Sequence, residues 1–150
     1  MASQFEIVQG VTDTLLDYCQ LLDEKRLDEF AELFTHDCTF AEGKPAYGRA
    51  HVRAKVRKLL QMFDALSHHL SNIRITPTSE TTAKASSYIY AWHQMQNGDQ
   101  LEIWGRYLDQ LQWVDGRWRI HYRQVQVQGW KGLDVLDIER VPQAAFADSG

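Results

Sequence analysis

An aspartate and a histidine that lie far apart in the chain are the parts of a proton-transfer pair. Asp23 ends an amphipathic helical segment, and His68 lies at the entrance of a β-rich segment. Imidazole suits a general base because its unperturbed pKa lies near neutrality, and a neighbouring carboxylate fixes its tautomer and stabilises the imidazolium. The alternatives are a solvated helix-end carboxylate and a polar strand-edge imidazole. The favoured interpretation is an enzyme that removes a proton next to an activating group.

Three further polar residues are candidates for the same site. His93 shares strand parity with a face of small residues that can border a cavity, or it is a surface histidine near a hairpin. Tyr18 either donates its hydroxyl to a substrate oxygen or packs in the core. Arg123 would hold a carboxylate or phenolate by a bidentate contact. Strict alternation places Arg123 opposite Ile120, so it reaches a pocket only past a β-bulge.

The composition is that of a single globular domain of 150 residues, with its core at about 8–128 and a tail or lid at 129–150. The 5 Trp, 6 Tyr and 6 Phe suit a wide apolar interior with a pocket. A net charge of −4 argues against a nucleic-acid partner. The cationic run from Arg49 to Lys58 is interpreted as a solvated helix face.

No metal or cofactor site is expected. Cys19 and Cys38 form no CxxC motif, the six histidines show no HxH or HExxH spacing, and no nucleotide-binding motif is present. The N-terminus lacks the features of a signal peptide, and no run of about 18 apolar residues occurs. The chain is therefore predicted to be cytoplasmic, without a membrane partner.

The hydrophobic periodicity predicts an α+β fold, with helices followed by a meander of strands. Helices are expected over 8–22, 27–34 and 49–62, and strands over 37–40, 72–76, 82–96, 101–114 and 118–127. Asn97-Gly98 predicts a type I′ hairpin, and Asp115-Gly116 predicts a second hairpin turn.

Several segments together resemble the SnoaL-like branch of the nuclear transport factor 2-like superfamily, over about residues 8–128. They are Asp28–Phe34, His68-x-x-x-Asn72, Gly105-Arg106-Tyr107 and Asp115–Ile120. The resemblance implies a cone-shaped barrel, in which a strongly curved, mostly antiparallel sheet wraps around N-terminal helices and a pocket opens at the wide end.

Within that branch the chain is most similar to scytalone dehydratases, bile-acid 7-alpha-dehydratases and lindane dehydrochlorinases. The resemblance implies that Asp23 and His68 form the catalytic pair. His93 matches the second histidine of scytalone dehydratases, and Tyr18 and Arg123 match a tyrosine and an arginine of the bile-acid enzymes.

The chain also departs from the scytalone dehydratase pattern. Leu22 and Glu42 stand where two tyrosines hold a water on the substrate carbonyl, and Gly105 and Tyr107 replace a serine and an asparagine. The proton-transfer pair is kept while the carbonyl-activating group is not, so scytalone itself is not the expected substrate.

These observations predict a cofactor-independent lyase that eliminates water or a similar leaving group from a small cyclic or aromatic hydroxylated substrate. A double-bond isomerase of the ketosteroid isomerase type and a non-catalytic binding or assembly module are the alternatives. The predicted catalytic residues are Asp23, His68, His93 and Tyr18, and the predicted substrate-binding residues are Arg123, Tyr107, Asn72 and Glu42. The resemblance further implies a homo-oligomer, a trimer rather than a dimer, formed through aromatic residues on the outer face of the sheet.

Overall fold

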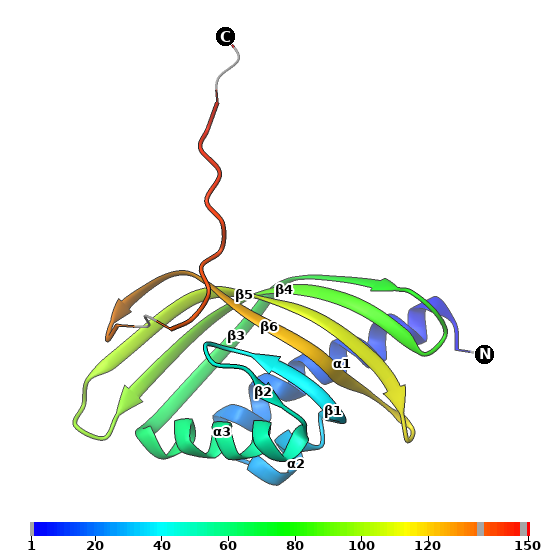
Figure 1. Ribbon diagram of the computed structural model, residues 1–150, viewed down its shortest axis with the longest axis horizontal. Coiled ribbons are helices and arrows are strands. Elements are labelled where there is room, and N and C mark those ends of the chain that lie inside the picture. Colours follow the sequence, from blue (N-terminus) through cyan, green and yellow to red (C-terminus); the bar gives the residue numbers. More distant parts are fainter. Residues whose placement is uncertain (1, 135–136, 148–149) are drawn as a thin grey trace.

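The computed structural model describes residues 2–134, 137–147 and 150 and confirms the α+β class. Three helices lie on the concave side of one six-stranded sheet (Figure 1). The elements are α1 (Gln4–Asp23), α2 (Leu27–Ala31), β1 (Phe34–Ala41), β2 (Ala46–Tyr47), α3 (Arg49–Met62), β3 (Phe63–Pro77), β4 (Thr82–Met95), β5 (Gln100–Val114) and β6 (Arg117–Gly132). The strand order is β2-β1-β6-β5-β4-β3, so the curved sheet is open, with β2 and β3 at its edges.

Helix α1 positions one half of the site because its C-terminal residue is Asp23. Its start is fixed by a capping box, in which the Ser3 hydroxyl accepts from the Glu6 amide and the Glu6 carboxylate accepts from the Ser3 amide. Gly10 allows Trp118 to approach closely, because a Cβ at this position would lie 2.7 Å from the indole. The helix thereby packs closely against the start of β6.

Strand β3 begins at Phe63, directly after α3, so the predicted start at residue 72 is wrong. The sequence missed residues 64–71 because they are largely polar, as suits an edge strand that pairs only with β4. The Lys25 ammonium donates to the carbonyls of Phe63 (2.5 Å) and Asp64 (3.2 Å) and fixes the start of the strand beside the end of α1. His68 therefore lies inside the strand, opposite Ala91.

The other strands differ from prediction at several points: β2 was not expected, and β6 continues to Gly132, past the predicted end at residue 127 and into the predicted tail. Strand β1 is longer than expected and pairs in parallel with β6, whereas the remaining pairs are antiparallel. The Asp115-Gly116 turn has two positive φ values, 51° and 77°, as a type I′ hairpin requires. At Asn97-Gly98 only the glycine has a positive φ, so the hairpin is present but the predicted turn type is wrong.

A β-bulge at His121 brings Arg123 to the inner face of the sheet. Leu111 pairs with Ile120 and Gln110 with Tyr122, which leaves His121 as the extra residue on β6. Ile120 and Arg123 are consequently both completely buried, with 0% of either residue exposed. The bulge that the alternation argument required is therefore confirmed.

Candidate active site

A cavity of about 410 Å³ opens on the concave side of the sheet between α1, α3 and the ends of β3, β4 and β5. Its wall is largely apolar, with side chains such as Leu22, Phe40 and Leu60. The polar groups in the wall are Tyr18, Glu42, His68, His93, Tyr107, Asp134 and Asp137. An apolar cavity with a few convergent polar groups is the usual form of a small-molecule site.

Asp23 and His68 are in direct contact at this cavity. The Asp23 carboxylate lies 2.6 Å from His68 Nδ1 through Oδ1, and its Oδ2 accepts the His68 main-chain amide at 2.8 Å. The side chains are 25% and 6% exposed. Because the carboxylate accepts from Nδ1–H, the lone pair of the neutral ring lies on Nε2. His69, whose side chain points to the other face, is exposed, so the choice between the two histidines agrees with the geometry.

His93 lies in the cavity wall rather than on the surface, and only 7% of it is exposed. Its ring is 5.4 Å from the His68 ring and nearly perpendicular to it. His93 Nδ1 donates to the Leu101 carbonyl at 3.3 Å, since a carbonyl only accepts. Burial, together with repulsion by His68 when that ring is protonated, lowers the pKa of His93 to about 4. At neutral pH His93 is thus an uncharged ring whose Nε2 accepts a hydrogen bond.

Arg123 lies between two tyrosine rings behind the cavity. Its guanidinium carbon is 4.1 Å from the Tyr18 ring centroid and 3.9 Å from that of Tyr107. Nε and Nη2 bind the two Asp109 oxygens at 2.7 and 2.8 Å, and both side chains are fully buried. Nη1 has no hydrogen-bond partner among the described residues. The charge that the sequence assigned to a substrate anion is therefore neutralised by Asp109.

Sequence reasoning missed Asp109, although a signal for it exists. Asp109 lies on β5 between Tyr107 and Leu111, with the same strand parity, and it is directly opposite Arg123 in the β5–β6 register. A carboxylate whose strand position faces the protein interior needs a charged partner. Burial raises the pKa values of Tyr18 and Tyr107, while the Arg123 charge opposes this shift, so both phenols keep their protons.

The remaining two predicted residues have different locations. Glu42 follows β1 and lines the cavity; burial raises the pKa of its carboxyl, although the charges of Lys55, His68 and Arg123 act in the opposite direction. Asn72 is exposed, at a bulge of β3, with a φ of 51°, and it does not line the cavity. The expectation from the His68-x-x-x-Asn72 motif, that Asn72 lies at the site, is therefore wrong, because the bulge turns Asn72 away from the cavity.

The segment after β6 covers part of the cavity. The Val127 amide donates to the Glu139 carbonyl at 2.8 Å, and the Val141 amide donates to the Val127 carbonyl at 2.9 Å. Asp137 and Ile138 are thereby placed in the cavity wall. From Pro142 onward the described chain extends away from the sheet (Figure 1). Of the predicted tail or lid, residues 135–136 and 148–149 lie outside the described residues.

The described part of the chain lacks two features that would suggest other functions, a membrane-spanning helix and a cluster of metal ligands. None of its helices is long and apolar enough to cross a membrane. Across residues 2–134, 137–147 and 150, no three His, Cys, Asp or Glu side chains are grouped as metal ligands would be.

The fold and cavity are those of a small-molecule-binding α+β domain, and sequence comparison identifies the family. Residues 4–124 match the model of the SnoaL-like domain, so the chain belongs to the SnoaL-like domain family. No functionally curated protein matches the chain significantly.

Solved structures with the same fold are numerous. A protein from Novosphingobium aromaticivorans described as a scytalone dehydratase is 27% identical, with a TM-score of 0.87 over 92% of this chain and 95% of that one. A protein from the same species described as an aromatic ring hydroxylase is 20% identical, with a TM-score of 0.82 over 88% and 96%. A hexachlorocyclohexane dehydrochlorinase from Novosphingobium barchaimii is 14% identical, with a TM-score of 0.78 over 93% and 97%. The last two show the fold alone.

Proposed function

We propose that the chain is a cofactor-independent lyase that eliminates water, or a similar leaving group, from a small cyclic or aromatic hydroxylated substrate. The observation that carries the proposal is the 2.6 Å contact between Asp23 and His68 in an apolar cavity. Such a carboxylate–imidazole pair has the tautomer and orientation that a general base needs.

In this reaction His68 Nε2 takes a proton from the carbon next to the activating carbonyl, and Asp23 stabilises the imidazolium that forms. The electrons of the broken C–H bond form the new C=C bond as the C–O bond to the leaving hydroxyl breaks. The hydroxyl departs as water after taking the proton back from the His68 imidazolium, which regenerates the base. The hydroxyl of Tyr18 or Tyr107 donates to the carbonyl oxygen as negative charge develops there.

His93 acts in this scheme as a hydrogen-bond acceptor, because its only ring proton is donated to the Leu101 carbonyl. It would orient a substrate hydroxyl beside His68 rather than supply a proton. The 27% identical protein described as a scytalone dehydratase supports the elimination chemistry. That name remains a statement about the other protein.

The test is a panel of hydroxylated cyclic ketones, assayed by mass spectrometry for loss of water. Asp23→Asn removes an ionic hydrogen bond worth about 1.5–3 kcal/mol, which predicts a fall in kcat/KM of about 10- to 150-fold. His68→Gln should abolish turnover. The matched controls are Asp64→Asn and His69→Gln, which change exposed neighbours on the same strand.

Two results would replace the proposal. A product of unchanged mass that still depends on Asp23 and His68 would establish an isomerase acting through the same base. Binding of panel compounds without any proton exchange in deuterated water, in wild type and variants alike, would establish a non-catalytic module.

We also propose self-association through the convex face of the sheet, where Tyr88 and Trp104 are 37% and 41% exposed. Exposed aromatic groups of this kind mark interaction surfaces. Light scattering should give the mass of a trimer, or of a dimer, and Trp104→Glu should reduce it to that of a monomer. A wild-type mass of one chain would refute self-association.

A further inference from the structure

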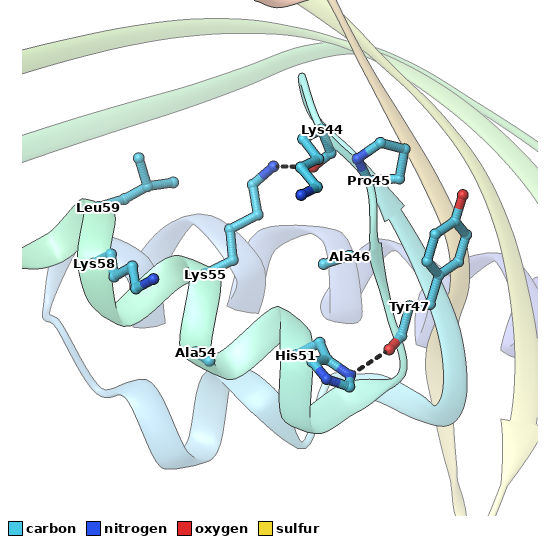
Figure 2. Close-up of a pocket in the computed structure, with 9 residues that line it drawn as sticks. All are labelled: Lys44, Pro45, Ala46, Tyr47, His51, Ala54, Lys55, Lys58 and Leu59. Atoms are coloured by element: carbon cyan, nitrogen blue, oxygen red, sulfur yellow. Dashed lines mark hydrogen bonds between the residues drawn. The ribbon is translucent and has the colours of Figure 1, made fainter.

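A second, open cavity of about 620 Å³ lies outside the His68 site, between the β1–β2 hairpin and helix α3 (Figure 2). We call it the hairpin groove. Its apolar surface is formed by Pro45, Ala46, Ala54 and Leu59. Lys44, Lys55 and Lys58 border this surface, with Lys44 on the hairpin and the other two on α3. The groove thus combines an apolar floor with ammonium groups from two elements.

The groove lies in the most cationic part of an acidic chain. Residues 43–63 contain no Asp or Glu but include six Lys or Arg, although the net charge of the chain is −4. Two of these cations are neutralised, since Arg49 pairs with Glu32 and Arg53 pairs with Asp28. A local positive field of this kind attracts anions.

The lysines of the groove differ in what they bind. Lys55 Nζ donates to the main-chain carbonyls of Glu42 and Lys44, so it serves the hairpin itself. The ammonium groups of Lys44 and Lys58 have no hydrogen bond or ion pair within the described parts of the chain. The two cations over the apolar floor are therefore free to receive an acid group.

We propose that the hairpin groove binds a small amphipathic acid, with its carboxylate or sulfonate between Lys44 and Lys58 and its apolar body on Ala46, Ala54 and Leu59. The acid group of the ligand would meet the ammonium groups at the border, and its apolar body would meet the apolar floor. The ligand is a small molecule rather than a nucleic acid, because the apolar floor offers nothing to a phosphate backbone.

The acid group that binds in the hairpin groove could belong to two kinds of molecule, because the groove adjoins the His68 cavity. Leu59 lines both cavities, and Lys55 holds the loop from which Glu42 enters the wall of the His68 cavity. The acid is either a free molecule confined to the groove or the acidic end of a larger compound that extends past Leu59. The inference itself stands whether or not the proposed lyase activity is correct.

The probe is 1-anilinonaphthalene-8-sulfonate, titrated by calorimetry and fluorescence. Lys44→Gln/Lys58→Gln should weaken binding roughly fivefold or more, since each exposed ion pair contributes modestly. Lys84→Gln/Lys131→Gln is the control, because it removes two exposed charges from other strands and should leave the affinity unchanged. The neutral N-phenyl-1-naphthylamine should bind more weakly, and ionic strength near 1 M should reduce the difference.

Amide shifts measured by NMR locate the probe. We expect shifts at Ala46 and Ala54. His68→Trp, which fills the other cavity, should preserve the affinity if the acid is confined to the groove and reduce it if the ligand extends past Leu59. Equal affinity of wild type and Lys44→Gln/Lys58→Gln, equal loss in the control pair, or shifts confined to the His68 cavity would each overturn the inference.

Discussion

The buried pair of Arg123 and Asp109 predicts a large loss of stability when its negative charge is removed. Asp109→Asn keeps the shape of the side chain but leaves the guanidinium without a counter-ion in a site where both side chains are 0% exposed. Breaking a buried pair in this way costs about 3–5 kcal/mol. The Tyr18 and Tyr107 rings still stabilise the cation, so we expect the lower end, about 3 kcal/mol.

Urea unfolding followed by tryptophan fluorescence measures this loss. With a slope of about 2 kcal/mol/M, the midpoint should fall by about 1.5 M at an unchanged slope. Asp64→Asn, an exposed aspartate, is the control and should change the midpoint little. Asp109→Leu/Arg123→Met removes both charges at similar volume and should recover most of the stability.

The refuting result is a small effect. If Asp109→Asn and Asp64→Asn agree within about 0.5 kcal/mol, the pair is not buried as described. If the double variant is no more stable than Asp109→Asn, the loss comes from packing rather than from an unpaired charge.

Three further predictions concern the cavity and the sheet. The pKa of His93 is about 4 in the folded chain and near 6.5 ordinarily, so as pH falls the unfolded chain binds a proton before the folded chain does. The free energy of unfolding should therefore fall by up to about 3 kcal/mol as pH drops from 6.5 to 4. Urea titrations of His93→Phe over the same pH range should show a smaller fall. Since the pKa of Glu42 is raised, ionisation destabilises the folded chain, so Glu42→Gln should raise the melting temperature at pH 7. The gain should shrink as pH falls from the raised pKa toward 4.5 and be nearly absent below it; a lower temperature of the variant at pH 7 would contradict this. Gly105→Ala should cost about 1–3 kcal/mol because its Cβ would lie 2.4 Å from the Gln126 carbonyl oxygen, whereas Gly129→Ala, with open space, should be nearly neutral in the same urea assay.

The helices were largely predictable because their apolar spacing is regular, although α2 ends at Ala31 and the expected helix over 27–34 was too long, since Phe34 begins β1. Helix α3 has the predicted bounds, and α1 begins earlier only because its capping box at Ser3 precedes the first apolar repeat. Strand β3 was only partly predictable, because an edge strand beside a helix end needs no hydrophobic alternation. Its position depends on tertiary contacts such as that of Lys25 with the Phe63 carbonyl, which the sequence does not display.

The site was predictable to a different degree for each residue. Asp23 and His68 follow from residue chemistry combined with the family resemblance, and the structure brings them into contact. Asn72 was expected at the site from its spacing to His68, but the β3 bulge places it outside the cavity wall. A bulge changes the face of the sheet to which every later residue of the strand points. Spacing along a strand therefore does not predict the facing of residues beyond a bulge.

The same reasoning on Arg123 decides what charge the cavity can accept. Alternation alone placed it on the outer face, and the bulge at His121 reverses that, but the bulge also aligns it with Asp109. Because Asp109 already neutralises the guanidinium, that cation is not available to a substrate; the wall presents protonated phenols and an uncharged His93 beside the carboxyl groups of Glu42, Asp134 and Asp137. Such a wall favours a neutral substrate with a carbonyl oxygen, on which charge develops only during the reaction. An acid group finds its complementary charge at the hairpin groove instead, where Lys44 and Lys58 border the floor.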